Sequence, residues 1–316
     1  MNRKLVINGQ ASGCAQRKCP DPGRARENTL SPPLADRLEE EARTCRFAAG
    51  DVARVPATLD PMQTRLRSDR GSGTPLVYIP GIDGSGALLL GNEAVLERAF
   101  RLVTLRHLSE ESAACRERDH YAALASDVVA VLDTLGIARA VLVAESFGGA
   151  IALRCALDHP ERVAALGIVN SFAWFPKRAS LALGRVFAPL VLRPVFDWFR
   201  PRIAPWSLFG KLREADALRR FAGVRGVYFD RGYRRRLAMI QGLDLRDELH
   251  RIDQPVRLFA ATHDRVVPSL RCARTMQERL PHATTSVVDG GGHLILPLAS
   301  LPWRDWLGEL ANRARA

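Results

Sequence analysis

The sequence predicts an α/β protein built around a mostly parallel, doubly wound sheet. Short apolar runs recur along residues 61–171 and 241–316, and they lack the apolar–polar alternation of half-exposed strands. Segments with apolar residues at helical spacing separate several of these runs. Strands buried on both faces that alternate with helices are typical of a parallel sheet covered by helices on both sides.

Composition limits the class of protein further. The 316 residues suffice for one large domain plus an insertion, and 47% of them are apolar, as in a soluble globular protein. The sequence contains no run of about 18 uncharged apolar residues, so no membrane-spanning helix is expected. Residues 1–30 lack the apolar segment of a secretory signal. The six cysteines are scattered without the paired spacing of zinc ligands, which favours free thiols. We therefore expect a cytoplasmic protein without a metal site.

Each element has its own local signal. Residues 1–60 are rich in Pro, Arg and Ala, and we expect a partly disordered N-terminal extension with one capped helix from Leu34. Thr64–Arg67 is expected as a short edge strand before a turn. Further strands are expected at residues 76–79, 101–107, 141–143 and 165–169, and two more begin after Gln254 and at Ser286. Helices are expected at residues 120–135, from Phe147 to His159-Pro160, from Pro268 onward, and at about 298–314.

The stretch from Ala140 to Ala152 organises this pattern. Apolar, mostly β-branched residues stop at Ser146, and small, helix-compatible residues follow at once. A strand that turns into a helix so abruptly needs a strained corner residue with small neighbours, here Ala144, Gly148 and Gly149. The pattern A-x-S-x-G resembles the nucleophile elbow of the α/β-hydrolase superfamily, usually G-x-S-x-G. A serine that only caps the helix is the alternative.

A glycine-rich loop follows the strand that ends at Ile79. Its sequence is Pro-Gly-Ile-Asp-Gly-Ser-Gly, from Pro80 to Gly86. It lacks both the Gly-Lys-Ser/Thr ending of a phosphate loop and the spacing of a dinucleotide fingerprint, which argues against nucleotide binding. The resemblance implies that this loop supplies one oxyanion-hole N–H, from Ile82, and that Phe147 supplies the other. Asp83 is expected to make an Asx-turn.

An acid and a base directly follow two further predicted strands, at the carboxyl ends of those strands. Asp264-Arg-Val-Val267 follows a predicted strand and fits the Asp-x-Val/Ile-Val pattern typical of the superfamily's triad acid, with Asp289 as a rival. Three glycines precede His293 and allow a tight backbone path back over the sheet. Because parallel strands end at one edge, Ser146, Asp264 and His293 are expected to converge there, in the hydrolase order.

Residues 172–240 break the alternation and are expected to form a helical cap. They hold 13 aromatic residues, and 15 Lys and Arg against four acids, so the segment carries +11 of the chain's net charge of +12. The apolar residues of this segment are expected to line a pocket for a long, lipophilic acyl group. Contact of the arginines with an anionic membrane is a second hypothesis; the simpler interpretation, solvated arginines around a cap core, is favoured there. No recognition motif accompanies the charge, so no nucleic-acid partner is expected.

The resemblance, which covers roughly residues 75–306 outside the cap, implies a serine esterase or lipase that needs no cofactor. The sequences of the loop (Pro-Gly-Ile-Asp-Gly-Ser-Gly) and of the elbow (Glu-Ser-Phe-Gly-Gly) are similar to those of the esterase/acyltransferase branch that includes plant phytyl ester synthases. Acyl transfer to an alcohol is therefore one alternative to ester hydrolysis, and a non-catalytic ligand-binding protein on the same fold is another. Chemistry on a lipophilic ester is the favoured hypothesis, because all three triad residue types are present in order.

Overall fold

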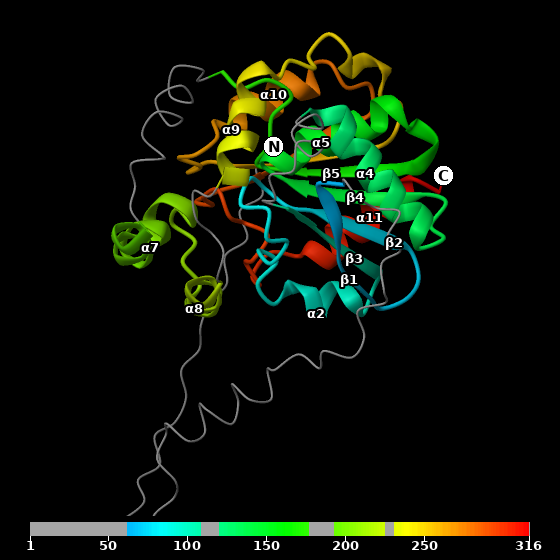
Figure 1. The fold of residues 1–316 in the computed structure, drawn as a ribbon. Helices are drawn as coiled ribbons and strands as arrows, with labels where there is room; N and C mark the ends of the chain where they lie inside the picture. The colour runs from blue at the N-terminus through cyan, green and yellow to red at the C-terminus, as the bar shows by residue number, and fades with distance from the viewer. Residues whose placement is uncertain (1–61, 109–119, 177–192, 225–230, 316) are drawn as a thin grey trace, which may run out of the picture. The chain divides into compact units, whose positions relative to one another are not determined.

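The computed structural model describes residues 62–108, 120–176, 193–224 and 231–315. They form the predicted α/β fold, a seven-stranded sheet with helices on both faces (Figure 1). The predicted helix from Leu34 lies outside the described residues. In chain order the strands and longer helices are β1 (Thr64–Arg70), β2 (Pro75–Ile79), α2 (Asn92–Glu97), β3 (Arg101–His107), α4 (Tyr121–Thr134), β4 (Ala140–Glu145), α5 (Phe147–Asp158), β5 (Val163–Val169), α7 (Arg193–Leu208), α8 (Ala215–Gly223), α9 (Arg231–Gly242), β6 (Val256–Ala261), α10 (Ser269–Gln277), β7 (Ala283–Val288) and α11 (Trp303–Arg313).

The sheet has the order β1-β3-β2-β4-β5-β6-β7. β1 runs antiparallel to β3, and every other neighbouring pair is parallel. The sheet is therefore mostly parallel and doubly wound, as predicted. Parallel strands end at a common edge, so the loops that follow β2, β4, β5, β6 and β7 all emerge on one side.

β4 lies at the centre of the sheet and is buried at all six positions. Leu142 and Ala144 belong to the core under α4 and α5, and Val141 and Val143 belong to the core under α11. Figure 1 shows α4, α5 and α10 on one face and α2 and α11 on the other. Burial on both faces explains why this strand reads as a continuous apolar run.

Three element boundaries lie three or more residues from the expectation. β1 continues past Arg67 to Arg70, because a register shift between Leu66 and Ser68 lets the edge strand keep pairing with β3. β7 begins at Ala283, three residues before the predicted start. The closing helix begins at Trp303, and the residues before it form a turn-rich segment instead.

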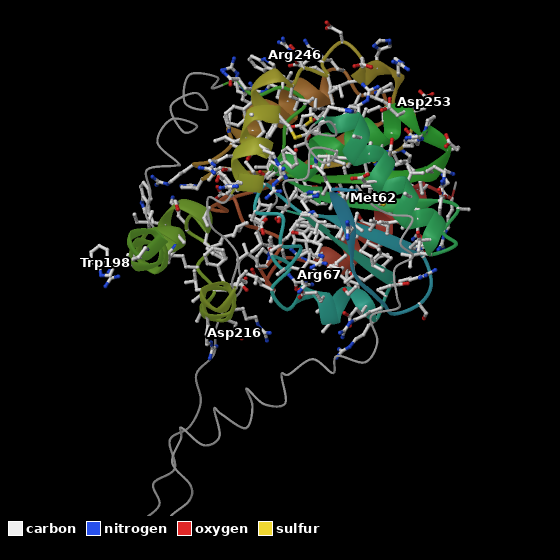
Figure 2. All side chains as sticks on the ribbon, in the orientation of Figure 1. Met62, Arg67, Trp198, Asp216, Arg246 and Asp253 are labelled. Carbon is white, nitrogen blue, oxygen red and sulfur yellow. The ribbon has the colours of Figure 1, made fainter. Side chains whose placement is uncertain are left out.

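The described part of residues 172–240 contains the helices α7, α8 and α9. Phe209 and Phe221 are buried against each other, with ring centroids 5.7 Å apart. Trp198 and Trp206 are half exposed, and Trp198 points outward from α7 (Figure 2). Part of the aromatic content is thus a packed core, and part faces outward. In the described parts of the chain, no helix combines the length and apolarity that spanning a bilayer requires.

Candidate active site

Ser146 sits at a strained corner between β4 and α5. Its backbone has φ 51° and ψ −121°, a conformation that side-chain-bearing residues rarely adopt. A side chain on Gly148 would collide with the carbonyl oxygens of Ile79 and Pro80, and one on Gly149 would collide with the Ser171 hydroxyl. The small residues after the serine are therefore a steric requirement of this turn, as the sequence suggested.

Asp264 and His293 meet across two loops. His293 Nδ1 lies 2.8 Å from Asp264 Oδ2, and their side chains are 9% and 1% exposed. Asp264 Oδ1 also accepts hydrogen bonds from the N–H groups of Val266 and Val267, both at 2.9 Å, and Oδ2 accepts one from the Ser269 hydroxyl. The carboxylate is thus held in one orientation. A carboxylate facing Nδ1 makes that atom the N–H donor and leaves Nε2 free to accept a proton.

The rival acid, Asp289, lies elsewhere. Its carboxylate accepts a hydrogen bond from the Thr262 hydroxyl at 3.0 Å. Within the described residues no hydrogen bond links Asp289 to His293, so Asp264 is the carboxylate that the fold pairs with the imidazole.

The pair shifts the titration of both partners. Burial alone would lower the pKa of His293, but the facing Asp264 carboxylate and the nearby Glu145 carboxylate raise it above its usual value. For Asp264 burial alone would raise the pKa, and the imidazole and the donated hydrogen bonds hold it below its usual value. A raised imidazole pKa stabilises the protonated form that appears when His293 takes up a proton.

The loop that carries His293 is anchored to the sheet by Asn170. The Nδ2 group of this buried residue donates to the carbonyls of Gly292 and His293, both at 2.9 Å, and its Oδ1 accepts from the N–H of Ala261. Asn170 has φ 43°, a left-handed conformation that Asn tolerates better than most residues. Its position just after β5 ties three strand exits together.

The cap holds the same loop from the other side. Leu294 N–H donates to Leu208 O at 2.7 Å, and Lys211 N–H donates to Gly290 O at 2.7 Å. A side chain on Gly292 would collide with the backbone of Leu208 and Gly210. The glycines before His293 therefore do more than permit a turn, because they let the cap backbone lie directly on this loop.

Ser146 shares this edge of the sheet with the pair, without a hydrogen bond between them. Across the described residues, no hydrogen bond joins the Ser146 hydroxyl to His293. The Ser146 carbonyl accepts from the Ser171 hydroxyl at 2.5 Å, and Glu145, the residue before the serine, is close enough to His293 to raise its pKa. Contacts of this kind often tighten only when a substrate binds.

The glycine-rich loop after β2 packs against the serine. A Cβ placed on Gly81 would lie 3.5 Å from Ser146 Cβ, and the loop turns through a Gly84 N–H to Gly81 O bond of 3.1 Å. The Ser85 N–H donates to Asp83 Oδ2 at 2.9 Å, which confirms the predicted Asx-turn. Of the two predicted donors, Phe147 directly follows the serine in the chain as the first residue of α5, and Ile82 directly follows Gly81, which packs against the serine from the other loop.

Sequence reasoning missed a buried polar cluster beside this loop. Glu145 is 2% exposed and accepts a hydrogen bond from the Tyr78 hydroxyl on β2, while its Oε2 has no partner among the described residues. Burial, together with the nearby Asp83 charge and against the Tyr78 hydrogen bond, raises the pKa of Glu145 to about 7. Arg236 of α9 reaches the adjacent loop from the cap and donates a hydrogen bond to the Ile82 carbonyl. The available signal was a polar residue at the end of β4, Glu145, and one next to the end of β2, Tyr78, in strands that are otherwise apolar.

No metal site accompanies these residues in the described ranges, since no group of three or more His, Cys, Asp or Glu side chains is arranged to hold an ion. The chemistry that the site offers is that of a serine at a strained turn, an imidazole oriented by a carboxylate, and backbone N–H groups nearby.

Comparison with known proteins gives the same fold. Residues 75–299 match the family described as alpha/beta hydrolase fold. A protein of Caulobacter sp. strain K31 named "Putative carbamate hydrolase RutD" is 30% identical over 249 residues, which covers 75% of this chain and 90% of that protein. A protein of the same name from Cronobacter sakazakii is 28% identical and covers 81% and 97%.

Solved structures agree at the level of the fold. The enol-lactonase from Burkholderia xenovorans LB400 superposes with a TM-score of 0.66 at 19% identity, over 79% of this chain and 96% of that one. The esterase from Exiguobacterium antarcticum gives 0.66 at 20% identity, over 79% and 95%. Sheet topology, serine elbow and sequence match agree, and the chain belongs to the α/β-hydrolase family.

Proposed function

We propose that this protein is a serine hydrolase that cleaves carboxylic esters through Ser146, His293 and Asp264. The observation that carries the proposal is the 2.8 Å hydrogen bond between His293 and Asp264, at the same sheet edge as the serine of the strained elbow. Acid, base and nucleophile candidates at one edge form the constellation that acyl transfer requires.

The proposed reaction follows from the orientation of the imidazole. With Nδ1–H on Asp264, His293 Nε2 takes the proton from the Ser146 hydroxyl as its oxygen attacks the ester carbonyl. The N–H groups of Ile82 and Phe147 stabilise the oxyanion, and each is expected to contribute about 10²–10³-fold in rate. His293 then gives its proton to the leaving alcohol, and a water molecule, activated in the same way, releases the acid from Ser146.

For the substrate we propose an ester with an apolar acyl group. Support comes from the apolar residues that the cap and the loops contribute on this side of the sheet. Leu294 directly follows His293 and is buried in one cluster with Leu88, Leu89, Phe209 and Phe221. A pocket that opens into this apolar cluster on substrate binding would favour an alkyl chain by roughly 0.8 kcal/mol for each CH₂ removed from water.

Replacement of Ser146 tests the proposal. Wild type and Ser146→Ala are compared on p-nitrophenyl esters and on labelling by a fluorophosphonate probe; the variant should lose both, whereas Ser126→Ala, at an exposed serine on α4, should lose neither. Turnover that persists undiminished in Ser146→Ala would show that Ser146 is not the nucleophile.

The substrate class needs its own measurement. A series of acyl lengths from acetate upward should show kcat/KM rising with length; a steady fall beyond acetate would contradict the apolar acyl group. A p-nitrophenyl carbamate belongs in the same series, because relatives carry the name of carbamate hydrolases. Product analysis with an added fatty alcohol separates hydrolysis from acyl transfer, since only transfer yields a new ester.

A further inference from the structure

We propose that Arg236, on the cap helix α9, is a positioning residue that holds the Ile82 peptide in place for catalysis. The inference rests on the serine-hydrolase function proposed above and assigns a residue of the cap to it. Arg236 is buried, at 3% exposure, and lies 154 residues from Ile82 in the chain. A buried guanidinium is costly unless its donors are used, so its contacts indicate its purpose.

The guanidinium joins two strand exits. Its Nε donates to the Ile82 carbonyl at 2.8 Å, and its Nη1 donates to the Leu108 carbonyl at 3.2 Å. Ile82 lies in the loop after β2, and Leu108 directly follows β3. The same two segments are joined by His107 N–H, which donates to the Gly84 carbonyl at 2.8 Å. A Cβ on Gly84 would lie 3.0 Å from Arg236 Nη2, so loop and guanidinium are in close contact.

These bonds fix both peptide planes beside Ile82. The Gly81 carbonyl accepts from Gly84 N–H at 3.1 Å, and in a planar trans peptide the Ile82 N–H points the opposite way. The Ile82 carbonyl is held by Arg236. With both planes held, rotation about the Ile82 backbone is restrained, and its N–H keeps one direction. Preorganised donors of this kind cost no reorganisation during the reaction.

The neighbouring charges fit this role. Burial raises the pKa of Asp83, the next residue of the loop, and the guanidinium charge and hydrogen bonds within the loop oppose that rise. Burial and the same guanidinium lower the pKa of His107 to about 3. A neutral His107 can donate from Nε2 to the Pro80 carbonyl at 3.3 Å while Nδ1 accepts from the Thr64 hydroxyl at 3.0 Å. The loop is thus held on both sides of Gly81, by His107 at Pro80 and by Arg236 at Ile82.

The test compares Arg236→Met, Arg236→Lys and Arg236→Ala with Arg234→Met in the full-length chain. Arg234 lies on the same helix and makes no hydrogen bond or ion pair in the described structure, which makes it a matched control. Each protein is titrated with a fluorophosphonate, so that kcat is expressed per reactive serine, and hydrolysis of p-nitrophenyl butyrate is measured.

We expect Arg236→Met to lower kcat about 10–100-fold with KM changed less than threefold, because a misdirected donor weakens transition-state binding and not substrate binding. Arg236→Lys should fall in between. Millimolar guanidinium should restore part of the activity of Arg236→Ala and should not affect Ser146→Ala or the control. Guanidinium rescue is a readout that a merely structural role would not give.

Two results would overturn the inference. One is a kcat per titrated serine that stays at the wild-type value in all Arg236 variants. The other is a loss that follows only the number of titratable serines, with no rescue by guanidinium, which would mean that Arg236 serves folding alone. A wild-type chain that neither turns over esters nor labels at Ser146 would instead overturn the proposed function, and the role of Arg236 with it.

Discussion

Glu145→Gln should make the protein more stable at alkaline pH and leave its stability at acidic pH nearly unchanged. The wild-type carboxyl is 2% exposed, accepts a hydrogen bond from Tyr78, and has a pKa raised by burial from 4.5 to about 7. Glutamine keeps the shape and the acceptor oxygen but cannot ionise. The substitution therefore removes one physical property, the charge.

The magnitude follows from the pKa. Between pH 4.5 and about 7 the unfolded chain releases this proton and the native chain keeps it, so stability falls as pH rises through this window. The full penalty is present above the native pKa. A shift from 4.5 to about 7, at about 1.4 kcal/mol per pKa unit, corresponds to roughly 3 kcal/mol as an upper bound.

Urea unfolding at pH 4.5 and pH 8.5 measures this effect. The gain of Glu145→Gln over wild type should grow by up to about 3 kcal/mol between the two values, whereas Glu161→Gln, at an exposed position in the turn after α5, should show no such growth. The variant should also lower the pKa of His293, whose rise Glu145 supports, and so move the acid limb of the kcat/KM profile to lower pH. A stability difference that is the same at both pH values would refute the reasoning.

Two further predictions concern the cap. Gly292→Ala should lower the free energy of unfolding by about 1–3 kcal/mol and lower kcat, because the added methyl group collides with the backbone of Leu208 and Gly210. The control Gly223→Ala, with open space around the new methyl group, should be neutral or slightly stabilising. Equal effects of the two substitutions on the melting temperature would contradict this prediction. The favoured interpretation, solvated cap arginines, predicts that flotation of the wild-type chain with vesicles does not depend on anionic lipid. Flotation that rises with anionic lipid and falls in Trp198→Ala, which removes a half-exposed aromatic side chain of the cap, would instead support membrane contact.

The sequence predicted the parts of the fold whose signals are local. β4 could be predicted because a strand buried on both faces needs an unbroken apolar run. The elbow could be predicted because the tight packing around Gly148 and Gly149 leaves no room for a side chain, so the sequence must have glycine there. Asp264 and His293 could be paired because each follows a strand of a parallel sheet, and such strands end at one edge. These predictions therefore rest mainly on the regular alternation of strands and helices and on the common edge at which parallel strands end.

The missed residues depend on contacts between distant segments. Arg236 is the third of three successive arginines, and nothing in those letters distinguishes the one that reaches Ile82. Asn170 bonds to residues more than 90 positions away, which no periodicity reports. The length of β1 was underestimated for a different reason. A bulge between Leu66 and Ser68 lets the strand continue into residues that are typical of turns.

The contacts of the cap bear on how enzymes of this kind can be recombined. The cap contacts three loops that carry predicted site residues: Trp206 lies 3.6 Å under the Arg265 guanidinium beside Asp264, Leu208 accepts a hydrogen bond from the residue after His293, and Arg236 donates one to Ile82. A chimaera that exchanges this insertion with one from a relative would remove all three supports at once. Crossover points that keep residues 206–211 and the first half of α9 with the parental sheet would spare them, so specificity could be varied in what lies between.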